Sequence, residues 1–357
     1  MSPLILFHVE HVYYLPQFLP VAKELDRRGA DCRFTAIDSD SRNELLQCIA
    51  DREGINLEIV GNNAAAVDLY NTHRPNWIVF GNIFRERKHL APLIKTAMLY
   101  HGIGIKDCYY DAGLQEMDVR FVEGRYREKE LLRRFPDCNV VRSGFAKLDP
   151  LADLAHPVCT LNDLKLSPER KTLLYAPTFY PSSIEKMART WPADFPEYNI
   201  IIKPHQFSVN LPEYRNQKKL LAQWGHFSNV YLAGENDFSI VPFMACADIL
   251  ISDASSVLFE FAALNKPVIW CDFIKLRWSY RGVLNFRYKK RMDGNILMKY
   301  KDIAAHVDRY SDLRTAVDQE LKNPARYEKQ RRQYSGEIVG DVSGKASVVI
   351  SDYLLSC

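Results

Sequence analysis

The sequence lacks the features that mark several common classes of protein. Its eight cysteines include no CxxC pair and no cysteine–histidine spacing of the kind that binds zinc. It has no run of about 18 apolar residues, the length that a membrane-spanning helix requires. The apolar run before His8 is too short for a secretory signal peptide. We therefore expect reduced cysteines and a cytoplasmic protein.

The chain also has almost no excess of positive over negative charge. The formal net charge of the 357 residues is only +3, which is too small to predict binding to nucleic acid. Apolar residues make up 47% of the chain and charged residues 25%, proportions that are typical of a globular protein. A chain of this length can form two domains of ordinary size. We expect no nucleic-acid partner.

The stretch from Ala247 to Trp270, ADILISDASSVLFEFAALNKPVIW, has the clearest local pattern. A short apolar run predicts a buried strand, and Val257, Phe261 and Leu264 then form one apolar face of a helix. Another apolar run follows Pro267 and predicts the next strand. The order strand, helix, strand indicates a parallel sheet.

The start of that helix has the chemistry of an anion site. Backbone N–H groups and the hydroxyls of Ser255 and Ser256 meet at the carboxyl end of a strand, where the helix dipole favours phosphate or pyrophosphate. Glu260 lies one turn further along the same face, where a carboxylate can accept hydrogen bonds from ribose. The alternative is that both serines only cap the helix. Local chemistry leaves both interpretations open.

Polar groups follow the predicted strands of the first half as well. His8, Glu10 and His11 come at the end of the first apolar run, and His101 follows a later one. Open α/β sheets bind ligands at this edge. The HxEH pattern lacks the spacing of the HExxH zinc motif and has no evident third ligand. We therefore expect acceptor binding or acid–base chemistry there and no metal; the alternative for His101 is a packed loop histidine.

A polar segment from His156 to Arg170 interrupts the strand pattern and predicts a linker. The pattern restarts after it, so both halves of the chain are expected to form doubly wound α/β domains. We place the first domain at residues 1–155 and the second at residues 156–335. Residues 336–357 are expected to contain a final helix that packs back on the first domain.

A basic and aromatic stretch runs from Lys275 to Arg291, KLRWSYRGVLNFRYKKR. It holds seven basic residues, four aromatic residues and no acidic residue. Such a composition is typical of segments that contact an anionic membrane surface or a polyanion. The alternative is an exposed loop.

Five motifs, found in one order along the chain, resemble the CDP-glycerol glycerophosphotransferase family, which makes teichoic acids and related polymers. They are HGIGIK from His101, GFAKLD from Gly144, YAPT from Tyr175, IIKPH from Ile201, and ILISDASSVLFEFAALNKPVI from Ile249, with a weaker match at GKAS from Gly344. The resemblance implies a GT-B-like fold, in which two Rossmann-like, doubly wound α/β domains face each other across a cleft.

The resemblance also implies a reaction. A hydroxyl of the acceptor attacks the β-phosphorus of CDP-glycerol, glycerol phosphate is transferred, and CMP leaves. His101, in the HG motif, is the implied base, and His205, in the KPH motif, is the implied donor to the leaving phosphate. No cofactor or metal is obligatory, because the helix dipole and hydrogen-bond donors can stabilise the phosphate charge.

The resemblance assigns the two substrates to different residues. The implied acceptor is a polyol phosphate or a lipid-linked saccharide, handled by the first domain, and the second domain holds the nucleotide donor. The donor-binding residues are Thr178, Lys203, Asp253, Ser255, Ser256 and Glu260, and the acceptor-binding residues are His8, His11 and Lys106. Contact with the membrane would be peripheral, on its cytoplasmic face.

The sequence departs from the family pattern at two places. Ala254 stands where an aromatic residue more often follows the aspartate, and Ile103 and Gly104 stand where the HG motif often continues with Thr-Pro. CDP-ribitol therefore stays open as a donor. A second hypothesis is a GT-B glycosyltransferase or a sugar-nucleotide epimerase that uses a UDP-sugar, because phosphate and ribose are common to these donors. A third is a non-enzymatic polyanion-binding or lipid-binding protein.

Overall fold

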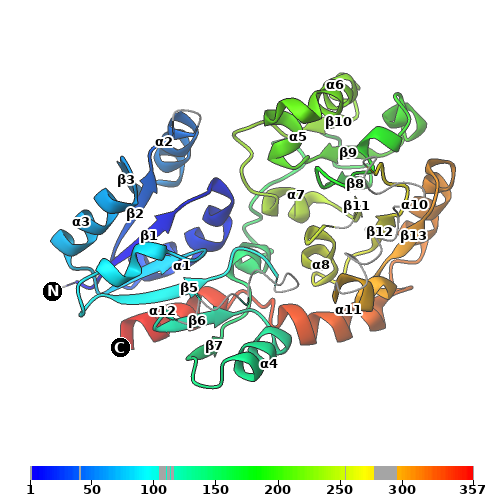
Figure 1. Ribbon diagram of the computed structural model, residues 1–357. Helices are drawn as coiled ribbons and strands as arrows, with labels where there is room; N and C mark the ends of the chain where they lie inside the picture. Colours follow the sequence, from blue (N-terminus) through cyan, green and yellow to red (C-terminus); the bar gives the residue numbers. More distant parts are fainter. Residues whose placement is uncertain are drawn as a thin grey trace. The chain divides into compact units, whose positions relative to one another are not determined.

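The computed structural model describes residues 2–39, 42–103, 110, 113, 116–253, 255–276 and 296–356. The chain divides into two compact units (Figure 1). Unit 1 consists of Met1–Leu154 together with Gly336–Cys357, and unit 2 consists of Ala155–Ser335.

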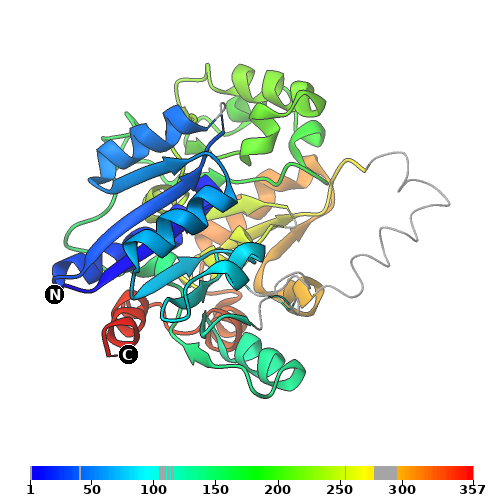
Figure 2. The ribbon, with the colours of Figure 1, turned by 60° about the vertical axis from the view of Figure 1, so that its left-hand side comes forward.

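Unit 1 is built on a parallel sheet of seven strands. The strands are β1 (Leu4–Val9), β2 (Asp31–Ile37), β3 (Asn56–Val60), β4 (Trp77–Phe80), β5 (Lys95–Leu99), β6 (Val119–Val122) and β7 (Val140–Arg142). They lie side by side in the order β3-β2-β1-β4-β5-β6-β7, and all of them except β4 are labelled in Figure 1. Figure 2 shows the same ribbon turned by 60°. The order therefore changes direction between β1 and β4, and this switch point is where doubly wound sheets bind their ligands.

The helices of unit 1 include one that comes from the end of the chain. They are α1 (Leu15–Arg27), α2 (Asn43–Glu53), α3 (Asn63–His73), α4 (Arg125–Arg134) and α12 (Ala346–Ser356), with 3₁₀ helices at Val12–Tyr14, Arg85–His89 and Ala146–Leu151. Helix α12, red in Figure 1, packs against α1. Asp149, in the GFAKLD motif, accepts hydrogen bonds from the backbone N–H groups of Ala346 (3.2 Å) and Ser347 (2.6 Å) and so holds the start of α12.

Unit 2 is built on a parallel sheet of six strands. The strands are β8 (Thr172–Tyr175), β9 (Asn199–Ile202), β10 (Val230–Leu232), β11 (Ile249–Ser252), β12 (Val268–Cys271) and β13 (Ala305–Val307). Their order is β10-β9-β8-β11-β12-β13, so the switch point lies between β8 and β11. Every residue of β8, β9, β11 and β12 is buried, which explains why these strands appear in the sequence as short apolar runs.

The helices of unit 2 are short, and aromatic side chains fill the core beneath some of them. The helices are α5 (Gln206–Asn210), α6 (Arg215–Trp224), α7 (Val241–Cys246), α8 (Val257–Ala262), α10 (Leu313–Lys322) and α11 (Glu328–Tyr334), with 3₁₀ helices at Ile184–Lys186, Trp191–Asp194, Pro212–Tyr214, Ile296–Ile303 and Tyr310–Asp312. A π-helix at Ser335–Val339 begins at the last residue of unit 2, and its other residues belong to unit 1. Tyr175, Trp191 and Trp224 are fully buried, and the two indole rings lie 5.9 Å apart. Edge-to-face pairs of this kind add to the stability that burial alone provides.

The prediction of two doubly wound α/β sheets is confirmed. Strands β4, β8 and β9 each contain a run of three or four buried apolar residues, which is the local signal that identifies a buried strand in the sequence. The sequence pattern does not reveal α2, β3 or α3. Strand β3 lies at the edge of its sheet and is partly exposed, so it lacks a long apolar run. None of the helices described here is long and apolar enough to cross a bilayer.

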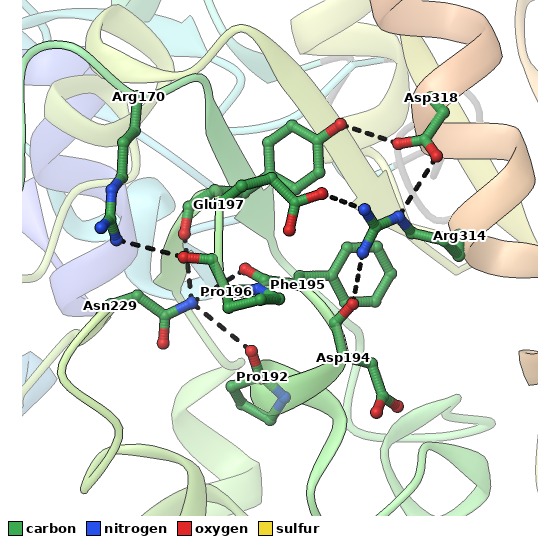
Figure 3. A network of polar contacts seen from close by, with 10 residues as sticks. Arg170, Pro192, Asp194, Phe195, Pro196, Glu197, Asn229, Arg314 and Asp318 are labelled. Atoms are coloured by element: carbon green, nitrogen blue, oxygen red, sulfur yellow. Dashed lines mark hydrogen bonds and ion pairs between the residues drawn. The ribbon is translucent and has the colours of Figure 1, made fainter.

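Polar side chains fasten the amino edge of the unit 2 sheet (Figure 3). Asn229, 7% exposed, precedes β10, and its Nδ2 donates to the carbonyl oxygens of Pro192 (3.4 Å), Phe195 (3.0 Å) and Tyr198 (3.1 Å). The guanidinium of Arg314, in α10, contacts Asp194, Glu197 and Asp318 and lies over the Phe195 ring. This edge lies opposite the one that carries the motif residues, so we assign these contacts to the stability of the fold and not to ligand binding.

Asn229→Ala is expected to lower the free energy of unfolding by about 1–3 kcal/mol, because it leaves buried carbonyl groups without their donor. Urea unfolding measures this loss. The matched control is Arg170→Ala, since the exposed Arg170 donates to only one carbonyl of the same segment, that of Pro196. A loss no larger in Asn229→Ala than in the control would contradict the role given to Asn229.

Candidate functional site

Histidine and tyrosine side chains gather at the carboxyl edge of the unit 1 sheet. His101 follows β5, whereas His11, Tyr13 and Tyr14 follow β1. The ring of His101 stacks on Tyr14 with a centroid distance of 4.7 Å and also contacts Tyr13 at 4.9 Å. Tyr13 in turn stacks on His11 at 4.8 Å. The structure thus joins two of the predicted histidines through a pair of tyrosines that the sequence analysis did not single out.

The hydrogen bond of His101 identifies which ring nitrogen carries the proton. Its Nδ1 lies 3.1 Å from the carbonyl oxygen of Gly81, directly after β4. A carbonyl oxygen can only accept, so Nδ1 is the donor. In the neutral ring the lone pair is then on Nε2. An imidazole held in this form can take a proton at Nε2, as a general base must.

His8 lies within β1, and only 4% of it is exposed. Its Nδ1 lies 2.7 Å from the hydroxyl of Tyr70, and its ring packs against Phe80 and Phe84. Burial lowers the pKa of His8 to about 4, because a charged ring would lose its hydration there. His8 is therefore a neutral group at physiological pH.

A cavity of about 250 Å³ lies at the switch point between β1 and β4. Its lining includes His8, Glu10, Tyr14, Asn63, Asn82 and Arg85. The Tyr14 hydroxyl donates to Glu10 Oε2 at 3.2 Å, so the tyrosine that stacks on His101 also forms part of the cavity wall. Arg42 donates to the backbone oxygen of Glu10 at 2.6 Å and lies 3.3 Å from His11 Nδ1. Burial is the main cause that lowers the pKa of His11.

Asp253 joins the ends of the two strands at the switch point of unit 2. The residue is fully buried. Its Oδ1 accepts from the backbone N–H of Thr178, after β8, at 2.7 Å. Its Oδ2 accepts from both the backbone N–H and the hydroxyl of Ser183, each at 2.9 Å. The predicted donor-site aspartate thus orients the loop that contains Thr178, and Ser183 is a partner that the motif pattern did not indicate.

Helix α8 begins close to the two serines of the predicted anion site. Ser255 Oγ accepts a long hydrogen bond of 3.4 Å from the Val257 N–H. Ser256 is the N-cap residue, but its side chain makes no capping hydrogen bond. Glu260 lies in the first turn and is 2% exposed. The helix ends at Ala262, earlier than the apolar pattern predicts, and spans six residues.

His205 follows β9 and is the N-cap residue of α5. Its Nδ1 accepts a hydrogen bond of 3.2 Å from the backbone N–H of Phe207. Since Nδ1 is the acceptor, the ring hydrogen of the neutral form is on Nε2. This is the opposite tautomer to that of His101. The rings of Phe179 and Phe207 pack against the imidazole at centroid distances of 4.7 and 4.8 Å. Lys203 lies two residues before His205, directly after the end of β9.

Several predicted features lie outside the residues that the structure describes. They are Lys106 of the HG motif, Ala254, and residues 277–291 of the basic and aromatic stretch. Lys275, at the start of that stretch, pairs with Glu185 at 3.4 Å. Within the described part of the chain, no group of three or more histidine, cysteine, aspartate or glutamate side chains is arranged to hold a metal ion.

A model of the family described as CDP-glycerol:poly(glycerophosphate) glycerophosphotransferase matches residues 115–335, more than half of the chain. This chain belongs to that family. The glycerophosphotransferase match includes all of unit 2 described above, with His205 and Asp253. His101 lies before the matched residues.

Curated relatives of this glycerophosphotransferase-family chain include two kinds of teichoic acid enzyme. A teichoic acid glycerol-phosphate primase of Bacillus subtilis is 28% identical over an alignment of 123 residues, and the match covers 32% of this chain and 29% of the primase. A teichoic acid poly(ribitol-phosphate) polymerase of Bacillus spizizenii is 29% identical over an alignment of 170 residues, and the match covers 42% of this chain and 25% of the polymerase. The chain therefore matches less than a third of the length of these relatives.

Solved structures of low sequence identity share the fold of this glycerophosphotransferase-family chain. The wall teichoic acid polymerase TagF is similar with a TM-score of 0.74 at 16% identity, over 99% of this chain and 88% of the TagF chain. A UDP-GlcNAc 2-epimerase from Neisseria meningitidis, bound to UDP-GlcNAc, has a TM-score of 0.66 at 15% identity, and the match covers 100% of both chains. The GT-B-like fold class predicted from the motifs is thus confirmed.

Gly81→Ala is expected to move Tyr14, because a Cβ at Gly81 would lie 2.6 Å from the Tyr14 ring. Overpacking of a buried ring costs about 1–3 kcal/mol of stability. Urea unfolding of unit 1 should show this loss, together with a change in the near-ultraviolet circular dichroism of the tyrosines. Gly61→Ala is the matched control, since nothing lies within 4 Å of its added Cβ. Equal stability of the two variants would contradict the packing of Tyr14 against Gly81.

The pKa of Asp253 provides a second test, because burial raises it from 3.8 to about 6. The folded protein then binds this proton more tightly than the unfolded chain does. Between these values the free energy of unfolding falls as pH rises, by about 3 kcal/mol for this group. Asp253→Asn removes that slope, so its stability relative to the natural chain should increase from about pH 4 to about pH 7.

Urea unfolding across this pH range measures the difference between the two proteins. Asp308→Asn, the same change at an exposed carboxylate, is the matched control. If Asp253→Asn follows the same pH dependence as the natural chain, the burial of the Asp253 carboxylate does not raise its pKa.

Proposed function

We propose that this chain transfers glycerol phosphate from CDP-glycerol to a hydroxyl group of an acceptor and releases CMP. The observation that carries the proposal is membership of the glycerophosphotransferase family over the whole of unit 2. The opposite tautomers of His101 and His205 support it, because a phosphate transfer between two oxygens needs one group that takes a proton and one that gives a hydrogen bond.

In this proposal unit 2 binds the nucleotide donor at the switch point between β8 and β11. Thr178, Lys203, Ser255 and Ser256 hold phosphate oxygens, and Glu260 accepts from the ribose. Asp253 keeps the Thr178 loop in place through its buried hydrogen bonds. A histidine-to-asparagine variant of TagF has been solved with CDPG, and the shared fold supports a donor of that kind here.

Unit 1 binds the acceptor in this proposal. His101 takes the proton of the attacking hydroxyl at Nε2, and His11 and Lys106 contact the acceptor around it. His8 contributes a neutral imidazole to the cavity at the switch point between β1 and β4. The acceptor is a polyol phosphate or a lipid-linked saccharide. The basic stretch that ends at Arg291 would bring the enzyme to the cytoplasmic face of an anionic membrane.

The chemical step balances with these groups alone. The acceptor oxygen forms a bond to the β-phosphorus while its proton passes to His101 Nε2. The bond between that phosphorus and the bridging oxygen breaks, and the electron pair stays on the phosphate of CMP. The Nε2–H of His205 donates a hydrogen bond to this phosphate as its negative charge develops. The positive charge of Lys203 also stabilises the negative charge that develops on this phosphate.

The direct test is CMP release from CDP-glycerol in the presence of a glycerol-phosphate-primed acceptor, with CDP-ribitol and UDP-sugars as parallel donors. The proposal expects CMP only from a CDP-polyol, and only when an acceptor is present. Release of UDP from a UDP-sugar, with no CMP from CDP-glycerol, would instead support the glycosyltransferase or epimerase hypothesis. The N. meningitidis epimerase has a fold similar to that of this chain.

Glutamine variants separate the roles of the two histidines. The amide of glutamine can donate a hydrogen bond from near the Nε2 position, but it has no useful basicity. His205→Gln should therefore retain more activity than His205→Ala. His101→Gln should be as inactive as His101→Ala, with a loss of about 10²–10⁴-fold in kcat. Normal CMP release by both alanine variants, with their fold intact by circular dichroism, would refute the assignment.

A further inference from the structure

A buried arginine lies next to His101 in unit 1. Arg127 is in the first turn of α4, and its side chain has no exposed surface. Its Nε lies 3.1 Å from Oε2 of Glu123, whose side chain is only 2% exposed. The sequence gives no sign of this burial, because Arg127 sits in a helix whose neighbouring residues are mostly charged.

The guanidinium contacts the residues on both sides of His101. Arg127 Nη2 donates to the carbonyl oxygen of Gly102 at 2.6 Å. The same guanidinium lies over the ring of Tyr100, with its Cζ 4.0 Å from the ring centroid. One planar group thus holds the residue before the histidine by a cation–π contact and the residue after it by a charge-assisted hydrogen bond.

The backbone of Glu123, the residue that pairs with Arg127, is tightly packed against the C-terminal part of the chain. A Cβ on Gly340 would lie 2.2 Å from the backbone oxygen of Glu123, and a Cβ on Gly124 would lie 2.2 Å from the backbone oxygen of Ile338. The two segments therefore approach more closely than any side chain allows. The C-terminal part of the chain thereby fixes Glu123 and Gly124, the two residues that directly precede α4, the helix that contains Arg127.

A buried ion pair is a poor source of stability. The desolvation of the two charges offsets much of their attraction, and apolar residues of similar volume often replace such a pair without loss. The position of this pair, directly beside the loop of His101, is better explained by the geometry that it imposes. Both flanks of His101 are fixed by Arg127, whereas the ring is fixed by Gly81 and Tyr14.

We propose that Arg127 is a positioning residue for the transfer reaction, which holds the backbone around His101 so that Nε2 faces the acceptor hydroxyl. The inference rests on the function proposed above, in which His101 is the base. Lysine cannot replace the arginine, because an ammonium group offers neither the flat surface that stacks on Tyr100 nor the fork that reaches Glu123 and Gly102 together.

The test compares Arg127→Lys with Arg133→Lys, a matched change in the same helix at an exposed residue that pairs only locally with Glu130. We expect kcat for CMP release to fall about 10²-fold in Arg127→Lys, as small misplacements of a catalytic group do. The KM for CDP-glycerol should stay unchanged, because the proposed donor residues are in unit 2. Arg133→Lys should behave like the natural chain.

A spectroscopic readout keeps this inference separate from the proposed function. The ring current of Tyr14 should shift the Cε1–H resonance of His101 in the natural chain, since the two rings stack. Arg127→Lys should move that resonance toward the position of an unstacked histidine, and His101→Gln assigns the signal by its loss. If the resonance moves but the natural chain releases no CMP, the proposed function fails and the positioning role stands.

Two results would overturn the inference. One is a folded Arg127→Lys protein with normal kcat and an unmoved His101 resonance; the other is a rise in the donor KM alone. If Arg127→Lys does not fold, Glu123→Gln takes its place, since it retains Arg127 and its bond to Gly102 but weakens the pair. A smaller fall in kcat at unchanged KM is expected there, and an unchanged kcat would count against the inference.

Discussion

The partner of Nδ1 determines what each of the two motif histidines can do. A neutral imidazole has one donor and one acceptor, so a partner that fixes one nitrogen fixes the other. The carbonyl of Gly81 makes Nδ1 of His101 a donor, and the N–H of Phe207 makes Nδ1 of His205 an acceptor. The neutral ring of His101 can thus accept a proton at Nε2, whereas that of His205 can donate a hydrogen bond from Nε2, and the proposed mechanism depends on that difference.

The Gly81 carbonyl lies beside His101 because the sheet of unit 1 is parallel, and the parallel sheet of unit 2 allows a similar long-range contact at Asp253. Successive strands deliver their carboxyl ends to one edge, so that Gly81 after β4 reaches His101 after β5, and Thr178 after β8 reaches Asp253 after β11. Close packing then makes these contacts specific. Gly81 has no room for a Cβ beside Tyr14. The buried carboxylate of Asp253 restricts the conformation of the loop from Thr178 to Ser183, because it accepts hydrogen bonds from both of these residues.

The sequence indicated the buried strands and the motif histidines, because apolar runs and polar residues at strand ends are local signals. It did not indicate the edge strand β3, whose half-exposed residues alternate without a long apolar run. The tautomer of His101, the stacking of Tyr14 and the burial of Arg127 depend on residues far apart in the chain, so no local pattern predicts them. The tyrosine pair after HxEH was the one available sign of the aromatic contacts around His101.

The tautomers of the two histidines are the most direct test of this account. Long-range ¹H–¹⁵N NMR of histidine-labelled protein distinguishes a protonated Nδ1 from a protonated Nε2, and the variants His101→Gln and His205→Gln assign the signals. The account predicts Nδ1–H at His101 and Nε2–H at His205 in the neutral rings. The reverse at either residue, or the same tautomer at both, would contradict the division of roles between them.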